Sequence, residues 1–309
     1  MNYVHSPVLL EEIIKNLVGE QDNLFLDCTV GEGGHSEAVL TRFPQIKVVG
    51  LDRDKEILQL AKERLSVFGE RFNGVNLNFR DASKLNEIID VGLFDCALVD
   101  LGVSVYHYKK SGRGFSFLEE EKLDMRLDSS GTSVSEIINN YSFEELRDIF
   151  FKCGEEKFSR EIARKIVFLR EKKLIESTKD LEEVVVSAIP PKFRNTKINP
   201  ATKIFQALRI VANNEFENIE IGIPQILSLL KVGGKLGVIT FHSLEDRIVK
   251  HLFNFMEKEC ICPPKIPKCV CGKKKLVKVI GKSITPTDEE IQKNPPSRSA
   301  RLRIVEKVL

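Results

Sequence analysis

The sequence lacks the segments that carry a chain into or across a membrane. No apolar run approaches the roughly 18 residues that span a bilayer. The start, MNYVHSPVLLEEII, has no basic region followed by a clean apolar core. We therefore expect no membrane partner. Seven cysteines without a secretory signal favour a reducing compartment, which predicts a cytoplasmic protein.

The sequence also has little net charge. A value of +2 over 309 residues is too small to indicate a nucleic-acid partner by itself. The charge is unevenly spread, because eight lysines and one glutamate lie between residues 258 and 282. This stretch is either a solvated loop or a surface that faces RNA.

Strand-like and helix-like patterns alternate in the first third of the chain. The expected strands are 23–28, 46–52, 75–81 and 94–104, and the expected helices between them are 35–43 and 55–68. This rhythm predicts an α/β fold with a parallel, doubly wound, Rossmann-like sheet. It resumes after a Gly233-Gly234 turn, with strands at 235–241, 275–281 and 300–308. We expect the last strand to be antiparallel.

Helical patterns replace strands between about 112 and 200. Ser142 and Glu145 are spaced as a capping box, and Gly154 is placed to end the helix that follows. We predict an inserted all-helical domain at 111–202. The sheet domain would then combine residues 1–110 and 203–309.

The Gly-rich stretch DCTVGEGGHS, residues 27–36, directly follows the first strand. It has no lysine after its glycines, which makes an NTP-binding loop a poor interpretation. Gly31 and Gly33 fit the dinucleotide fingerprint, but its third position is Ser36. Asp52, at the end of the second strand, suits a ribose diol. NAD and S-adenosylmethionine both present that diol, so these residues leave both cofactors open.

Two carboxylates favour a methyl donor. Asp27 precedes the glycines and would repel a pyrophosphate, whereas it suits the cationic groups of S-adenosylmethionine. Asp100 ends the fourth strand, at the edge where ligands bind in open α/β sheets. An acceptor there can hold the N–H of a target amine and direct its lone pair towards the methyl carbon. Either residue could instead cap a loop or a helix.

Nine stretches taken together resemble the MraW/RsmH family. They are HSPVLLEE, DCTVGEGGHS, LDRD, DLGVS, GRGFSF, LDMRLD, NPATKIFQALRI, FHSLEDRIVK and NPPSRSARLRI. The resemblance covers nearly the whole chain in order. It implies a Rossmann-like class I methyltransferase sheet with an inserted helical, substrate-recognition domain. It further implies that S-adenosylmethionine methylates the exocyclic N4 of a cytidine in the decoding region of 16S rRNA, free or in a 30S subunit.

The resemblance also implies roles for individual residues. Gly33, Gly34 and His35 would line the methionine end of the cofactor, and Asp81 with Ala82 would border the adenine. His107 stands, by alignment, where a glutamine of the family contacts the cofactor. The cofactor-binding residues expected here are Asp27, Gly31, Gly33, Gly34, His35, Asp52, Asp81, Ala82, Asp100 and His107. The expected catalytic residues are Asp100 and His242, and His242 has an equally plausible structural role.

Other functions and sites stay open from the residues alone. The alternatives to a methyltransferase are an NAD-linked oxidoreductase and a non-catalytic RNA-binding factor for ribosome assembly. The C-x-C-x6-C-x-C spacing of Cys260, Cys262, Cys269 and Cys271 could close on zinc or form a reduced loop, and we assign no metal. Expected RNA contacts are 258–282, Arg298, Arg301 and 160–173, with Tyr106, Tyr108 or Phe115 stacking on the base. Packing within the inserted domain is the favoured role for Phe115.

Overall fold

The computed structural model describes residues 7–194, 199–263 and 268–309, and the chain divides into two compact units. The first unit is Met1–Gly102 with Phe216–Leu309, and the second is Val103–Glu215. The second unit begins earlier and ends later than the helical insertion predicted at 111–202. His5 and Ser6 of the HSPVLLEE stretch lie outside the described residues.

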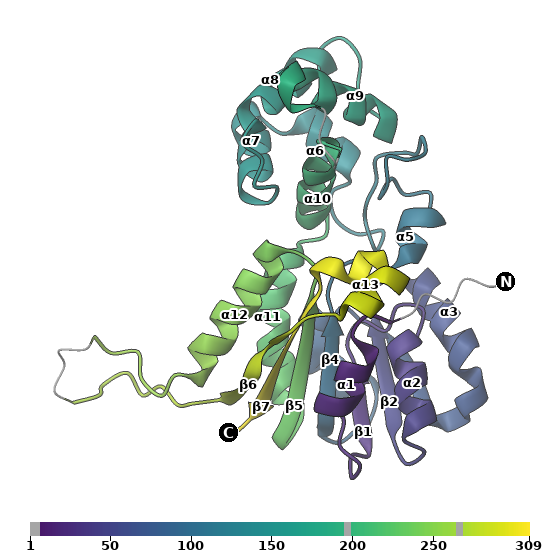
Figure 1. The fold of residues 1–309 in the computed structure, drawn as a ribbon, viewed down its shortest axis with the longest axis vertical. Helices are drawn as coiled ribbons and strands as arrows, with labels where there is room; N and C mark the ends of the chain where they lie inside the picture. The colour runs from purple at the N-terminus through teal and green to yellow at the C-terminus, as the bar shows by residue number, and fades with distance from the viewer. Residues whose placement is uncertain (1–6, 195–198, 264–267) are drawn as a thin grey trace. The chain divides into compact units, whose positions relative to one another are not determined.

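A seven-stranded sheet forms the centre of the first unit, in the order β3-β2-β1-β4-β5-β7-β6 (Figure 1). The strands are β1 Leu24–Asp27, β2 Lys47–Asp52, β3 Phe72–Asn76, β4 Phe94–Asp100, β5 Leu230–Thr240, β6 Val277–Ile284 and β7 Arg301–Lys307. The first five are parallel, and β7 is antiparallel to both β5 and β6. The predicted α/β fold and its antiparallel last strand are therefore confirmed.

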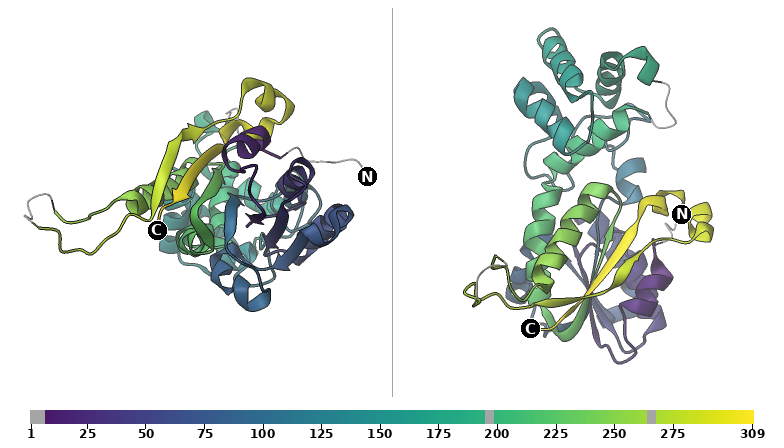
Figure 2. Two further views of the ribbon diagram at one scale, coloured as in Figure 1. Left: turned by 90° about the horizontal axis from the view of Figure 1, so that it is seen from below. Right: turned by 60° about the vertical axis from the view of Figure 1, so that its left-hand side comes forward.

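Both faces of this sheet are buried. Phe25 and Val48 belong to one apolar core, and their chain neighbours Leu26 and Val49 belong to the other. Helices α1 (Leu10–Asn16) and α2 (Gly34–Arg42) cover the first face, and α11 (Glu215–Ser228) and α12 (Ser243–Glu257) cover the second (Figure 2). Strands buried on both faces read as continuous apolar runs, which is why the sequence reveals them.

Shorter elements complete the first unit. They are α3 Lys55–Leu65, α4 Leu85–Ile88 and α13 Asp288–Lys293, with 3-10 helices η1 Ser66–Arg71, η2 Phe79–Lys84 and η4 Pro295–Ser299. Within the described ranges, no helix has the length and apolar character needed to cross a bilayer.

Two local predictions for the sheet are wrong. The strand expected at 75–81 ends at Asn76, and η2 follows. The cause is Asn78, whose side chain accepts a hydrogen bond from the Arg80 N–H at 3.1 Å and so caps the 3-10 helix. The Gly233-Gly234 turn lies instead inside β5, in an irregular stretch where its register with β4 shifts.

Within its described residues, the second unit contains helices and no extended strand, only an isolated bridge between Lys122 and Ser177. The helices are α5 Val105–Lys109, α6 Val134–Asn140, α7 Phe143–Lys152, α8 Ser159–Arg170, α9 Thr178–Ala188, η3 Pro191–Phe193 and α10 Ala201–Ala212. The capping box predicted for α7 is present, with Ser142 and Glu145 each bonding the other's backbone N–H. Phe115 is buried in this unit's core, as favoured.

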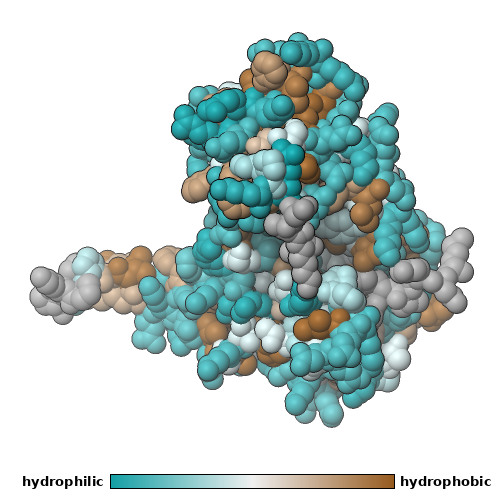
Figure 3. Space-filling model, turned by 45° about the horizontal axis from the view of Figure 1, so that its top comes forward, coloured by the Kyte–Doolittle hydropathy of each residue, from teal (hydrophilic) through white to brown (hydrophobic). Residues whose placement is uncertain are grey.

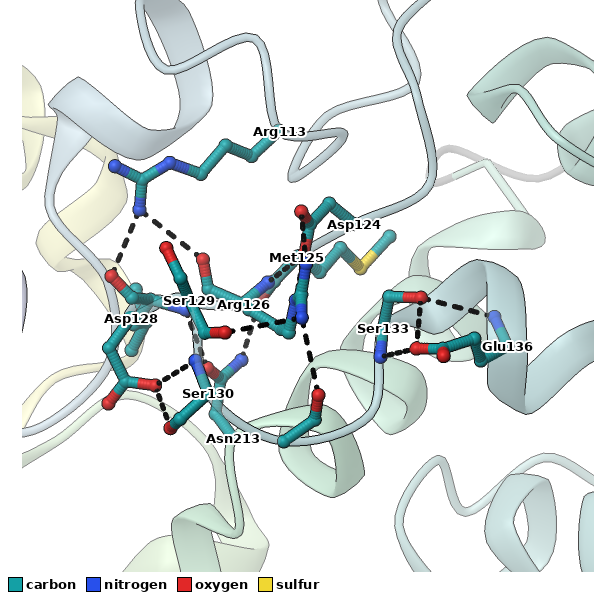
Figure 4. A network of polar contacts seen from close by, with 12 residues as sticks. Arg113, Asp124, Met125, Arg126, Asp128, Ser129, Ser130, Ser133, Glu136 and Asn213 are labelled. Carbon is teal, nitrogen blue, oxygen red and sulfur yellow. Dashed lines mark hydrogen bonds and ion pairs between the residues drawn. The ribbon is translucent and has the colours of Figure 1, made fainter.

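The LDMRLD stretch forms a polar network inside the second unit (Figure 4). The Arg126 guanidinium donates two hydrogen bonds, of 2.6 and 3.0 Å, to the Asp124 carboxylate. The fully buried amide of Asn213 donates to the Met125 carbonyl at 2.7 Å and accepts from the Leu127 N–H at 2.9 Å. This network holds an irregular segment in place, because it supplies partners for backbone groups that no helix or strand satisfies.

Candidate active site

The strand order reverses between β1 and β4, and this reversal positions the candidate site. In an open α/β sheet, such a switch point leaves a crevice at the carboxyl ends of the strands. Asp27 is the last residue of β1, Asp52 of β2 and Asp100 of β4. Three predicted residues that are far apart in sequence are therefore brought to one edge of the sheet.

The Gly-rich turn connects β1 to α2 at this edge. Gly31 and Gly33 have positive φ values of 54° and 84°, which disfavour other residues. A Cβ on Gly33 would lie 3.0 Å from a methyl carbon of Leu65, and one on Gly34 would lie 2.8 Å from the Pro7 ring. The glycines are therefore needed for conformation and close packing.

Asp27 is almost completely buried beneath the turn, at 2% exposure. Its carboxylate accepts a 2.7 Å hydrogen bond from the Ser36 hydroxyl and a 3.3 Å bond from the Thr29 N–H. Burial nevertheless raises the pKa of Asp27 from 3.8 to about 6, and the charge of Asp52 adds to this effect. Ser36, which departs from the dinucleotide fingerprint, thus orients the buried carboxylate.

Asp100 lies across the crevice on β4. Its backbone N–H donates to the Thr29 hydroxyl at 2.7 Å, which ties β4 to the turn. Its Oδ1 is buried and has no hydrogen-bond partner among the described residues. Burial, followed by the charges of Asp27 and Glu245, raises the pKa of Asp100 well above its ordinary value. An acceptor in this condition gains from any ligand that supplies a donor or a positive charge.

His35 lies beside the other oxygen of Asp100. Its Nε2 lies 3.0 Å from the Val8 carbonyl, and a carbonyl can only accept, so Nε2 carries the proton. Its Nδ1 therefore faces Asp100 Oδ2, at 3.8 Å. The ring is buried, at 7% exposure, and an unprotonated Nδ1 at this distance donates no hydrogen bond to the carboxylate.

Asp52 has both oxygens directed to the backbone of the same edge. Oδ2 accepts from the Gly31 N–H at 3.0 Å, and Oδ1 accepts from the Asp54 N–H at 2.9 Å. These bonds fix the carboxylate at the end of β2, beside the turn. A ribose contact there stays a prediction.

His242 is the N-cap of α12, next to the end of β5. Its Nδ1 accepts from the Glu245 N–H at 3.3 Å, while Glu245 Oε2 accepts from the N–H groups of Phe241 and His242. Its Nε2 lies 3.1 Å from Glu245 Oε1. Nδ1 therefore serves as a helix cap, which supports the structural alternative for His242, whereas Nε2 is buried and makes no hydrogen bond within the described residues. Whether it also meets the base stays a prediction.

Three other predicted residues have their observed contacts elsewhere in the described chain. Asp81 forms an ion pair with Lys84 at 3.0 Å. Ala82 is completely buried, and its methyl group packs in the core of the first unit. His107 belongs to the second unit, where it is buried with its ring 5.2 Å from that of Phe115. Their cofactor contacts stay predictions.

Sequence reasoning missed three residues that build the site. Thr29 and Ser36 position Asp100 and Asp27, and Glu245 is 1% exposed and adds a third buried carboxylate. The spacing of His242 and Glu245 matches a capping box and could have indicated Glu245. Nothing in the sequence indicated the partners of Thr29, since its contact spans 71 residues.

The crowded carboxylates decide which ligand fits. Asp27, Glu245 and the Oδ1 atom of Asp100 are all buried. In addition to burial itself, the charges of Asp27 and Glu245 both raise the pKa of Asp100. A pyrophosphate would add negative charge, whereas a sulfonium and an α-ammonium would relieve the repulsion. The orphaned Oδ1 of Asp100 fits the same ligand. With the sheet order described above, this site defines a class I methyltransferase whose cofactor is S-adenosylmethionine.

The chain belongs to the MraW methylase family, whose model matches residues 2–308. A "Ribosomal RNA small subunit methyltransferase H" of Treponema denticola is 46% identical, covering 100% of this chain and 98% of that protein. Its namesake in Carboxydothermus hydrogenoformans is 44% identical, covering 100% and 99%. Among solved structures, a putative rRNA-methylase from Clostridium thermocellum aligns with a TM-score of 0.43 at 11% identity, over 99% of this chain and 100% of that one.

Proposed function

We propose that this chain methylates the exocyclic N4 of a cytidine in the decoding region of 16S rRNA. The small-subunit rRNA substrate is supported by the names of relatives that match along the full chain. The choice of an amine acceptor rests on one observation: Asp100 presents a buried oxygen without a hydrogen-bond partner, in the described residues, at the switch point of the sheet.

In this proposal Asp100 is the catalytic residue, because it touches the reacting amine. Its Oδ1 accepts a hydrogen bond from one N–H of the cytidine amine. That bond localises the nitrogen lone pair, which is otherwise delocalised into the base. Asp27 and Asp52 hold the ligand's cationic and ribose groups in the positions that methyl transfer requires.

The reaction balances with these residues alone on the protein side. S-adenosylmethionine, when bound, supplies the methyl group. A nitrogen–carbon bond forms at N4, the sulfur–carbon bond breaks, and one N4 proton is released. Methylation makes that proton acidic, so Asp100 needs only to accept and pass it to water. No strong general base is required, which agrees with the helix-capping role of His242 Nδ1.

The remaining assignments complete the proposal. Asp81 and Ala82 would border the adenine, and Gly33, Gly34 and His35 would line the methionine end. Gly31 and His107 would add further cofactor contacts. The second unit would recognise the substrate, which is rRNA, free or in a 30S subunit. Because that substrate is cytoplasmic, so is the reaction proposed here.

The test is transfer of a labelled methyl group from S-adenosylmethionine to small ribosomal subunits that lack the modification. We expect the label on cytidine N4. Asp100→Ala should lower the rate by about 100–1,000-fold, the scale seen when one preorganised electrostatic group is removed. Arg126→Lys, in the second-unit network, is a control for general effects of substitution.

The alternatives have separate outcomes. Calorimetric binding of NAD but not S-adenosylmethionine would indicate the oxidoreductase. Binding of rRNA without transfer by the wild type would indicate a non-catalytic assembly factor. Transfer that is undiminished in Asp100→Ala would refute the role of Asp100 while leaving the enzyme class intact.

A further inference from the structure

Four cysteines converge in the segment between α12 and β6, well away from the crevice. This segment extends from the sheet unit (Figure 1) and carries apolar colouring on its surface (Figure 3). Its exposed apolar side chains include Ile261 and Val270, at 49% and 77% exposure. Every pair among the sulfurs of Cys260, Cys262, Cys269 and Cys271 lies within 4.8 Å.

The sulfur–sulfur distances match a tetrahedral metal site. Four of the six separations are 3.5, 3.9, 3.5 and 3.8 Å. Four ligands about 2.3 Å from a zinc ion stand about 3.8 Å apart in a tetrahedron. A disulfide needs sulfurs about 2.05 Å apart, so these are not paired cystines. A mononuclear centre with four thiolate ligands accounts for all of these distances at once.

The backbone around the cluster is arranged as it is at thiolate ligands. The Cys262 N–H donates to Cys260 Sγ at 3.3 Å, and the Val270 N–H donates to Cys262 Sγ at 3.4 Å. Such bonds stabilise negative charge on sulfur and orient the ligands. They also compensate for the C-x-C spacing, which is narrower than the usual C-x2-4-C.

The described part of this segment has no regular secondary structure around the cysteines. Its described residues from 258 to 276 form neither a helix nor a strand. Cys260 and Cys269 are exposed and Cys262 and Cys271 half-buried, so no apolar core surrounds them. A long loop segment without a hydrophobic core of its own is usually held in one conformation by a cross-link or a metal ion.

We propose that Cys260, Cys262, Cys269 and Cys271 bind one structural zinc ion. Four thiolates complete the tetrahedron, leaving no open position for a substrate, so the site is structural. Zinc with four thiolates carries a formal charge of −2, which the neighbouring Lys268, Lys273, Lys274 and Lys275 offset.

The metal site would extend the order of the sheet unit into its basic segment. At the base, the Leu276 N–H donates to the Met256 carbonyl at 2.9 Å, and the Lys273 ammonium lies 4.5 Å from the centre of the Phe255 ring. These contacts fix one end of the segment against α12. Zinc would fix the other end.

The experiment is metal analysis by mass spectrometry on full-length protein, purified under reducing conditions and washed with a mild chelator. We expect one zinc per wild-type chain and less than a tenth of that in Cys269→Ser. Cys153→Ser, which removes a half-buried thiol of the second unit, is the matched control and should keep its zinc. Circular dichroism checks that each variant folds.

A second measurement does not depend on the metal acquired in the cell. Wild-type protein stripped with a mercurial reagent and titrated with cobalt should develop the absorption of a tetrahedral tetrathiolate, and one equivalent of zinc should abolish it. No zinc on purification and no cobalt signal would overturn the proposal. Stoichiometric iron in place of zinc would overturn the assignment of the metal. Neither measurement uses rRNA or S-adenosylmethionine, so both are independent of the proposed function.

Discussion

The pKa values of two sets of carboxyl groups, one in each unit, are shifted in opposite directions. In the LDMRLD network of the second unit, Arg126 pairs Asp124 with two hydrogen bonds. Burial opposes ionisation of Asp124, but the hydrogen bonds and charge of Arg126 outweigh it and lower the pKa of that carboxyl. At the sheet edge, burial raises the pKa values of both Asp27 and Asp100.

This difference distinguishes carboxylates that stabilise the fold from carboxylates that are available to a ligand. A polar network with its partners in place stabilises an irregular segment and needs nothing more. Carboxylates that are buried close together are costly until a cation arrives. The sheet edge is therefore built for a ligand, and the LDMRLD network is built for the fold. Substitutions in the two regions should fall into two distinct groups.

The largest expected effect is a loss of stability in the LDMRLD network of the second unit. Asn213→Ala removes the partners of the Met125 carbonyl and the Leu127 N–H, which lie in a buried network. It should lower the free energy of unfolding by about 3 kcal/mol, the cost of leaving such groups unsatisfied. Urea denaturation measures this. Folded Asn213→Ala should bind S-adenosylmethionine normally, and a loss of affinity would break the contrast.

The opposite pattern is expected at Asp27. Asp27→Asn keeps the shape but removes the charge that faces the cationic ligand, so affinity for S-adenosylmethionine should fall by about 10–100-fold. Calorimetry measures the affinity. Its unfolding free energy should be unchanged or higher at pH 7.5, because a buried charge is gone. A marked loss of stability would place Asp27 with the structural residues instead.

The titration of Asp27 gives a third, smaller effect. Its pKa is 3.8 in an exposed state and about 6 in the fold. The folded state thus holds the proton more tightly, so stability falls as pH rises from about 4 through 6. The loss should be smaller in Asp27→Asn, in which Asp100 keeps its own raised pKa. Cofactor affinity should change in the other direction, falling about tenfold between pH 7.5 and 5 as the carboxylate is neutralised. A pH-independent affinity in the wild type would contradict the role of Asp27.

The smallest effect is expected for substitutions of His242. Their result shows whether His242 belongs with the structural residues or with those that act on the ligand. Asparagine is also a good N-cap, so His242→Asn should change stability by less than about 0.5 kcal/mol and leave the methyl-transfer rate within about threefold. His242→Ala should cost about 1 kcal/mol through loss of the cap. If His242→Asn binds the cofactor normally but transfers methyl groups 100-fold more slowly, His242 acts on the base.

Local patterns carried the prediction of the fold a long way. The alternation of apolar strands and amphipathic helices depends on residues that are close together in sequence, and so does the Ser142 capping box. Both predictions are confirmed. The strand expected at 75–81 was wrong because period-two alternation in VNLNFRD competes with the side chain of Asn78, which caps a 3-10 helix. A single capping bond of this kind leaves no trace in hydrophobic periodicity.

Most strand positions, the Gly-rich turn, and the places of Asp27, Asp52 and Asp100 at strand ends could be read from the amino-acid order, although the third strand was misplaced. Those features depend on neighbours within a few residues. Only the tertiary structure decided which groups share one space: Thr29 with Asp100, Ser36 with Asp27, and the four cysteine sulfurs. The reason is physical. The shifted pKa values of Asp27 and Asp100 come from burial and from charges brought together by folding, and a linear chain has neither.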